Sequence, residues 1–89
     1  MEPSILMNLT RGRIVRMMAG HGPSTATAIA AELCLDRATV TRALGLLAEA
    51  GIIRRTDAKA KNTGPTYAVD LPQVHQELEQ ARFFFAPWL

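Results

Sequence analysis

The chain has 89 residues, 48% hydrophobic and 20% charged, so it can form one domain with a core and is not a disordered tail. Its formal net charge of +2 favours an anionic partner only mildly. The single cysteine, Cys34, excludes an internal disulfide and a multi-thiolate metal site, and no apolar run reaches the roughly 20 residues of a bilayer span. The first residues lack the basic flank and apolar stretch of a secretory signal, so we expect a cytoplasmic protein without a membrane partner.

The N-terminal part of the chain predicts an extension over residues 1–9, followed by a helix with Thr10 as its N-cap. An earlier start near Ser4 remains an alternative, because the apolar pattern continues back through the extension. The stretch 20–23, Gly-His-Gly-Pro, ends the helix. The spacing of one buried helix face is found at Ile14, Val15, Met17 and Met18.

Residues 25–50 predict two more helices separated by a short turn. Thr25 is the expected N-cap of the first of them, and Asp36 is the expected N-cap of the second. Gly51 follows the last turn as the residue after the helix C-terminus. The second of these helices carries an apolar stripe at positions i, i+3, i+4 and i+7, formed by Val40, Ala43, Leu44 and Leu47.

After Gly51 the pattern changes from helical spacing to the short β-prone runs typical of strands. Residues 52–57 and 66–71 are such runs, and the polar, basic segment 58–65 between them ends in a Gly-Pro turn. We therefore predict a β-hairpin, or wing, over residues 52–71. Pro72 then opens a final helix over residues 72–86.

Helix, helix, three-residue turn, helix and basic hairpin is the element order of a winged helix. The run TATAIAAELCLDRATVTRAL, residues 25–44, resembles the helix-turn-helix of MarR-like and ArsR-like bacterial regulators. Residues 47–53 are similar to their pattern of a leucine, a short polar stretch, a glycine and two apolar residues. The resemblance implies one mainly α domain over residues 1–89, a winged helix-turn-helix of order α-α-α-β-β-α. This sequence departs from the family pattern at Cys34, where glycine is usual, and at Gly45 and Leu46, where polar residues are usual.

Positive charge is concentrated between residues 37 and 61, where six basic residues stand against two acidic ones. The helix after Asp36 turns its non-apolar face outward, and such a helix fits the major groove of duplex DNA. Arg42 can contact guanine at two atoms, a contact worth about 1–3 kcal/mol of discrimination. Helix N–H groups near residue 24 can hold a phosphate, and the wing can reach the backbone or a minor groove. The predicted DNA-binding residues are Ser24, Thr25, Arg37, Ala38, Thr39, Thr41, Arg42, Arg54, Arg55, Lys59, Lys61 and Asn62.

The final helix carries apolar and aromatic residues that favour a dimer surface, although a helix folded back on its own domain is the alternative. A homodimer would place two recognition helices about 34 Å apart over a pseudo-palindromic operator, as expected of a transcriptional repressor. Any small-molecule effector would sit at this interface, or there is none. The predicted interface residues are Val74, Leu78, Ala81, Phe84, Phe85 and Trp88.

Other candidate chemistry is weak. Residues 32–36, Glu-Leu-Cys-Leu-Asp, resemble a metal-binding segment of some ArsR-like regulators but lack its second cysteine, so we expect no metal and a thiol that is buried or packed in the turn. His75 and Glu79 are spaced i, i+4, which is typical of a surface pair. No enzyme motif and no cofactor motif is present. The alternatives to a regulator are an architectural or recombination-directionality factor of a mobile element, and a winged-helix protein-interaction module.

Overall fold

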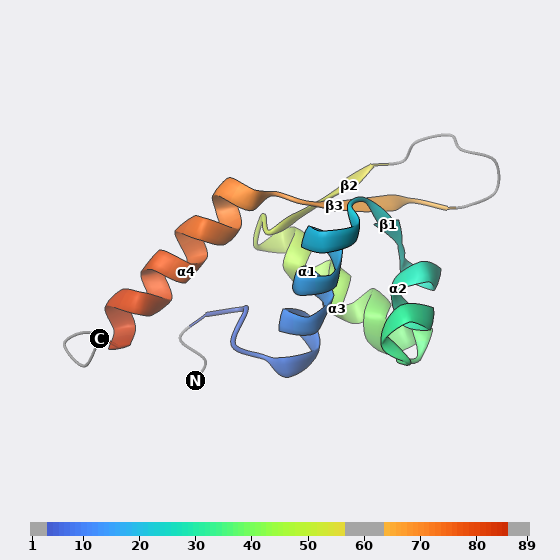
Figure 1. Cartoon of the computed structure of the whole chain (residues 1–89), viewed down its shortest axis with the longest axis horizontal. Helices are drawn as coiled ribbons and strands as arrows, with labels where there is room; N and C mark the ends of the chain where they lie inside the picture. The colour runs from blue at the N-terminus through green and yellow to red at the C-terminus, as the bar shows by residue number, and fades with distance from the viewer. Residues whose placement is uncertain (1–3, 57–63, 86–89) are drawn as a thin grey trace.

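Three helices pack together beneath a small antiparallel sheet, and a fourth helix extends from one end of the sheet (Figure 1). The computed structural model describes residues 4–56 and 64–85, with side chains up to residue 82. The elements are α1 (Leu9–His21), β1 (Ser24–Thr25), α2 (Ala26–Leu33), α3 (Arg37–Glu49), β2 (Ile53–Thr56), β3 (Thr66–Val69) and α4 (Leu71–Phe85). The predicted fold class, mainly helical with a hairpin wing, is confirmed.

The sheet has one strand more than the sequence predicts. Its order is β1-β3-β2, and β1 pairs antiparallel with β3 through Ser24 opposite Tyr67 and Thr25 opposite Thr66. The hairpin register sets Ile53 opposite Val69. The predicted order therefore lacked β1, because a two-residue strand is too short to produce an alternating pattern.

Polar side chains begin each of the first three helices. Thr25 and Asp36 cap α2 and α3 as predicted, each accepting from the backbone N–H three residues on. The prediction of Thr10 as the α1 cap is wrong: Asn8 has the extended backbone of a cap, and its Oδ1 accepts from the Arg11 N–H at 3.0 Å. The helix does not begin near Ser4, because Met7 N–H donates to the Ser4 carbonyl in a separate turn.

The turn between α2 and α3 is made by a cysteine in the left-handed region. Cys34 has φ 57° and ψ 43°, the conformation for which glycine is the usual choice, and holding it there costs about 1 kcal/mol. Leu35 N–H then donates to the Ala30 carbonyl and closes the turn. The thiol is exposed, so the expectation that it is buried is wrong, although its place in the turn is as predicted.

The core lies where α1, α2 and α3 meet the sheet. The whole predicted stripe of α3 is buried, and Ile14 and Met18 of α1 pack against it as expected. At roughly 25 cal/mol per Å² of apolar area removed from water, these side chains provide the main drive for folding. The fully buried large side chains are Ile14, Met18, Ile29, Val40, Leu44, Leu47, Ile52 and Ile53.

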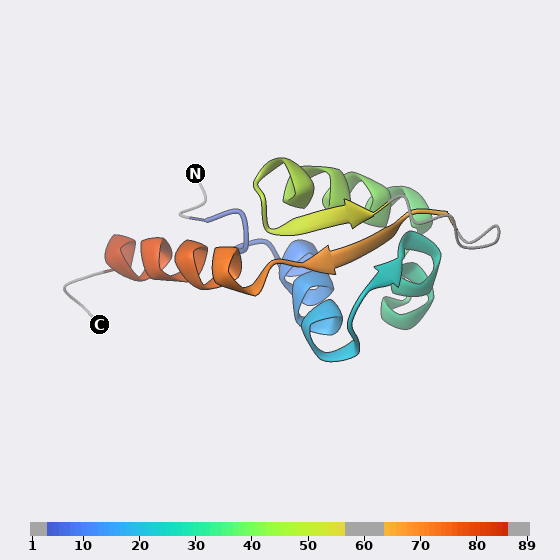
Figure 2. The same ribbon diagram turned by 90° about the horizontal axis from the view of Figure 1, so that it is seen from above.

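Helix α4 leaves the body at its first turn, and both Figure 1 and Figure 2 show its far end projecting away from the sheet. Asp70 holds that turn, because its carboxylate accepts from the Gln73 N–H at 3.1 Å and its carbonyl from the Val74 N–H at 3.0 Å. Pro72 lies in the first turn, as predicted. Among the described residues, no helix is long and apolar enough to cross a membrane.

Candidate nucleic-acid interface

Helix α3 is fixed in the body by its buried stripe, so the residues between the stripe positions face outward. Arg37, Ala38, Thr41 and Arg42 are all exposed, as predicted, and Thr39 is half-buried. The Thr39 hydroxyl donates to Asp36 Oδ1 at 2.6 Å, and its N–H donates to Oδ2 at 3.0 Å. These two bonds, the hydroxyl bond first, hold the pKa of the Asp36 carboxyl below its ordinary value. Asp36 therefore stays charged at the N-terminus of the helix.

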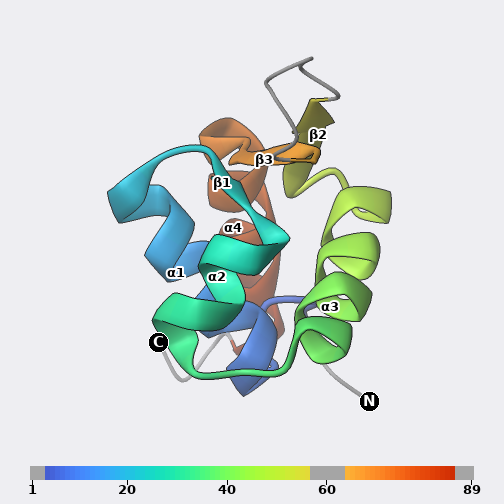
Figure 3. The same cartoon turned by 90° about the vertical axis from the view of Figure 1, so that its right-hand side faces the viewer.

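A hollow of about 250 Å³ lies between α3, the start of α2 and the wing strands, and we call it the wing-side hollow. Four predicted DNA-binding residues line it: Thr25 from β1, Arg37 and Thr41 from α3, and Arg55 from β2. These three elements are separated in the sequence and come together only in the fold. Figure 3 shows α2, α3 and the two wing strands on this side of the molecule. The hollow is lined by Thr25, Ala26, Thr27, Arg37, Thr41, Arg55, Gly64, Pro65 and Tyr67.

The wing-side hollow is lined by cations and hydroxyl groups, and by no carboxylate among the described residues. Arg37 has no hydrogen-bonding or ion-pairing partner in the described part of the chain, so its guanidinium is available to an outside anion. Arg54 lies outside the hollow and is 79% exposed, 3.8 Å from the Asp70 carboxylate. So long an exposed ion pair contributes little, which leaves Arg54 able to exchange partners.

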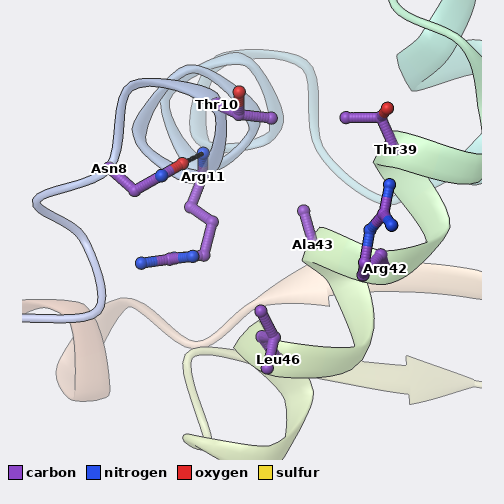
Figure 4. Close-up of a pocket in the computed structure, with 7 residues that line it drawn as sticks. All are labelled: Asn8, Thr10, Arg11, Thr39, Arg42, Ala43 and Leu46. Atoms are coloured by element: carbon purple, nitrogen blue, oxygen red, sulfur yellow. Dashed lines mark hydrogen bonds between the residues drawn. The ribbon is translucent and has the colours of Figure 1, made fainter.

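Two predicted contact residues, Thr39 and Arg42, lie on the opposite flank of α3. They line a second hollow of about 230 Å³, the α1-side hollow, together with Asn8, Thr10, Arg11, Ala43 and Leu46. Figure 4 shows the Thr39 side chain pointing toward Thr10 across this space, and the Arg42 side chain running along α3 toward Thr39. The single reading face expected from the sequence is therefore divided into two flanks, with Arg37 on one and Arg42 on the other.

The remaining predicted residues are placed as follows. Ser24 lies in β1, and its hydroxyl donates to the Gly22 carbonyl at 2.9 Å. Val74 is buried in the core of its own chain, Ala81 is 3% exposed, and Leu78 is 49% exposed. Outside what the structure describes lie Lys59, Lys61, Asn62 and Trp88, and the side chains of Phe84 and Phe85.

Sequence reasoning missed several residues that line the two hollows. Tyr67 was predicted only as a strand residue, and Asn8 and Thr10 were assigned no contact with a ligand. Only tertiary packing brings the start of α1 beside α3, so no local pattern could have revealed them. Among the described residues, no three His, Cys, Asp or Glu side chains lie together in a way that could hold a metal ion.

The three-helix body, the sheet and the α3 surface between two hollows define a winged helix-turn-helix domain. The chain belongs to the helix-turn-helix domain family, whose family model matches residues 6–56. The predicted class, a winged helix-turn-helix of the kind found in DNA-binding transcriptional regulators, is confirmed.

Solved structures extend the comparison. The apo-Zalpha domain of zebrafish PKZ is 31% identical with a TM-score of 0.65, over 70% of this chain and 92% of that one. The Zalpha domain of Carassius auratus PKZ, in complex with Z-DNA, is 27% identical with a TM-score of 0.60, over 67% and 90%. A possible transcriptional regulator for arsenical resistance is 25% identical with a TM-score of 0.68, over 94% and 79%. No curated protein sequence matches the chain.

Proposed function

We propose that the chain is a transcriptional regulator that binds duplex DNA in a sequence-specific manner, with α3 in the major groove. The observation that carries the proposal is the wing-side hollow, which brings Thr25, Arg37, Thr41 and Arg55 together from three elements. The Arg37 guanidinium has no partner among the described residues, and together with the neighbouring hydroxyl groups it can donate hydrogen bonds to a base edge or to a phosphate. The family match and the structural likeness to a possible transcriptional regulator support the same function.

The proposal includes a homodimer formed through α4. This helix projects from the body and exposes Leu78, an apolar side chain that a second copy would cover. A two-fold dimer would present two copies of α3 to successive major grooves, about 34 Å apart, on a pseudo-palindromic site.

The experiment that tests DNA binding is a salt titration on duplexes selected from fragments of the source genome. The logarithm of the affinity should fall linearly with the logarithm of salt concentration, at about 0.9 per neutralised phosphate. Arg37→Ala should weaken binding and either relax sequence preference or lower this slope by about one. Arg16→Ala is the matched control, because Arg16 is exposed in a hollow between α1 and α2, away from α3. Undetectable or salt-independent binding by the unaltered chain would refute the proposal.

A second candidate function is binding to left-handed DNA. The two Zalpha domains are each covered to 90% or more by this chain, and one of them was solved with Z-DNA. Circular dichroism of an alternating dC-dG duplex separates the two candidates. Inversion of the DNA spectrum on adding the protein would favour the left-handed form, whereas an unchanged right-handed spectrum with tight binding favours the major-groove proposal.

A further inference from the structure

The α1-side hollow is built from two elements that are remote in sequence, and most of its polar atoms are hydrogen-bond donors. Arg42 and Thr39 border it from α3, and Asn8, Thr10 and Arg11 border it from the start of α1 (Figure 4). No carboxylate lines it among the described residues. Asp36 lies beside the hollow, and its carboxylate is engaged by the hydroxyl and the backbone N–H of Thr39.

Several of these donors have no partner within the described part of the chain. The Arg42 guanidinium makes no hydrogen bond or ion pair there. The Asn8 side chain uses Oδ1 to cap α1, so its Nδ2 group must be the donor that remains. The Thr10 hydroxyl is also unbonded. Two lining residues differ, because their donors are already used within the chain. The Thr39 hydroxyl donates to Asp36 Oδ1 at 2.6 Å, and Arg11 Nε donates to the Ile5 carbonyl at 2.6 Å and holds the N-terminal segment in place.

This arrangement of donors suits a phosphate group, including the phosphodiester of a nucleic-acid backbone. A phosphodiester offers unprotonated oxygens that accept from guanidinium, amide and hydroxyl groups together. The hollow is open to solvent, so a phosphate group carried on a polymer backbone can approach it. The positive end of the α1 dipole adds to the attraction, although side-chain donors from both helices define the site.

We infer that the α1-side hollow binds a backbone phosphate of the DNA strand opposite the one that borders the wing-side hollow. A helix about 10–12 Å across nearly fills a major groove about 12 Å wide, so its two flanks meet the two backbones. Thr10 and Asn8 thereby become DNA-contacting residues, and Arg42 holds a phosphate where sequence reasoning assigned it a guanine. The inference rests on the proposed function.

Asn8→Asp tests the site without removing the helix cap, because the carboxylate still accepts from the Arg11 N–H while a donor becomes a repelling oxygen. We expect the affinity for a duplex bound by the unaltered chain to fall roughly tenfold, and the salt slope to fall by about one. Gln76→Glu is the matched control, since it is the same amide-to-carboxylate exchange on an exposed residue of α4. Thr10→Val removes one donor at constant volume and should give a smaller loss of affinity.

The contacted phosphate is found by replacing phosphates one at a time with neutral methylphosphonates. One position on the strand opposite the wing should weaken binding of the unaltered chain and leave the Asn8→Asp chain unaffected. If Asn8→Asp and Gln76→Glu bind with equal affinity and equal slope, the phosphate site is refuted while the proposed function stands. If the unaltered chain binds no duplex, both are refuted. Binding of inorganic phosphate lost in Asn8→Asp, with DNA affinity unchanged, would identify a small-anion site and overturn the assignment to DNA.

Discussion

The Ser4 hydroxyl donates a 2.7 Å hydrogen bond to Oε2 of Glu77, joining residues 73 positions apart. Ser4 is 4% exposed, and its Oγ also accepts from the Leu6 N–H, so this side chain is fully engaged. Val74 anchors the first turn of α4 in the core, and this bond attaches the helix to the N-terminal segment as well.

Ser4→Ala should therefore loosen α4. A hydrogen bond to a charged group contributes about 1.5–3 kcal/mol, and partial exposure of Glu77 puts the expected loss near the lower figure. Urea denaturation measures the loss, and amide hydrogen exchange should rise in the second half of α4. Gln80→Ala, an exposed change on the same helix, is the control. Unchanged exchange in Ser4→Ala would show that the bond does not hold the helix.

The Asp36 cap predicts a pH dependence. The folded-state pKa of Asp36 is lowered by the Thr39 bonds, so its contribution to stability is complete above the unfolded pKa and is lost as pH falls through the folded one. Asp36→Asn should melt at a lower temperature than the unaltered chain at pH 7. The difference should shrink as the pH falls below about 4, the ordinary range of the group. A difference that stays constant down to pH 2 would contradict this account.

Glycine substitutions should have opposite effects at two positions. Gly45 lies within α3, and an added Cβ would meet nothing within 4 Å, so Gly45→Ala should stabilise the fold by about 0.5–1 kcal/mol. Gly22 has φ 87° and ψ −167°, a region essentially limited to glycine, so Gly22→Ala should destabilise it by about 1–3 kcal/mol. Thermal unfolding measures both effects: the melting temperature should rise for Gly45→Ala and fall for Gly22→Ala. Shifts of the same sign in the two variants would contradict this prediction.

The proposed dimer predicts a specific effect at Leu78. Placing a charge there should weaken self-association at least tenfold in Leu78→Glu, because the carboxylate would be buried at the interface. Sedimentation over micromolar concentrations measures the effect, with Gln80→Glu as the control for charge. If the unaltered chain is a monomer at high micromolar concentration, the symmetric-operator proposal is wrong.

The features that the sequence predicted well are those with a local cause. The α3 stripe follows from helical spacing, and the caps at Thr25 and Asp36 follow from side-chain chemistry at a helix start. The strand at Ser24 and Thr25 has no such local cause, since it exists only because β3 lies beside it. The same holds for the candidate site: exposure of Arg37 and Arg42 was predictable, but their separation onto two flanks depends on where the wing and α1 pack.

Cys34 has a practical consequence. It carries the sole thiol of the chain, exposed and held in a tight turn three residues before the first residue of α3. A spin label attached there would move with the recognition helix, not with a mobile loop. In a two-fold assembly the two labels would give one distance, and that distance would reveal directly whether the spacing between recognition helices matches one turn of the double helix.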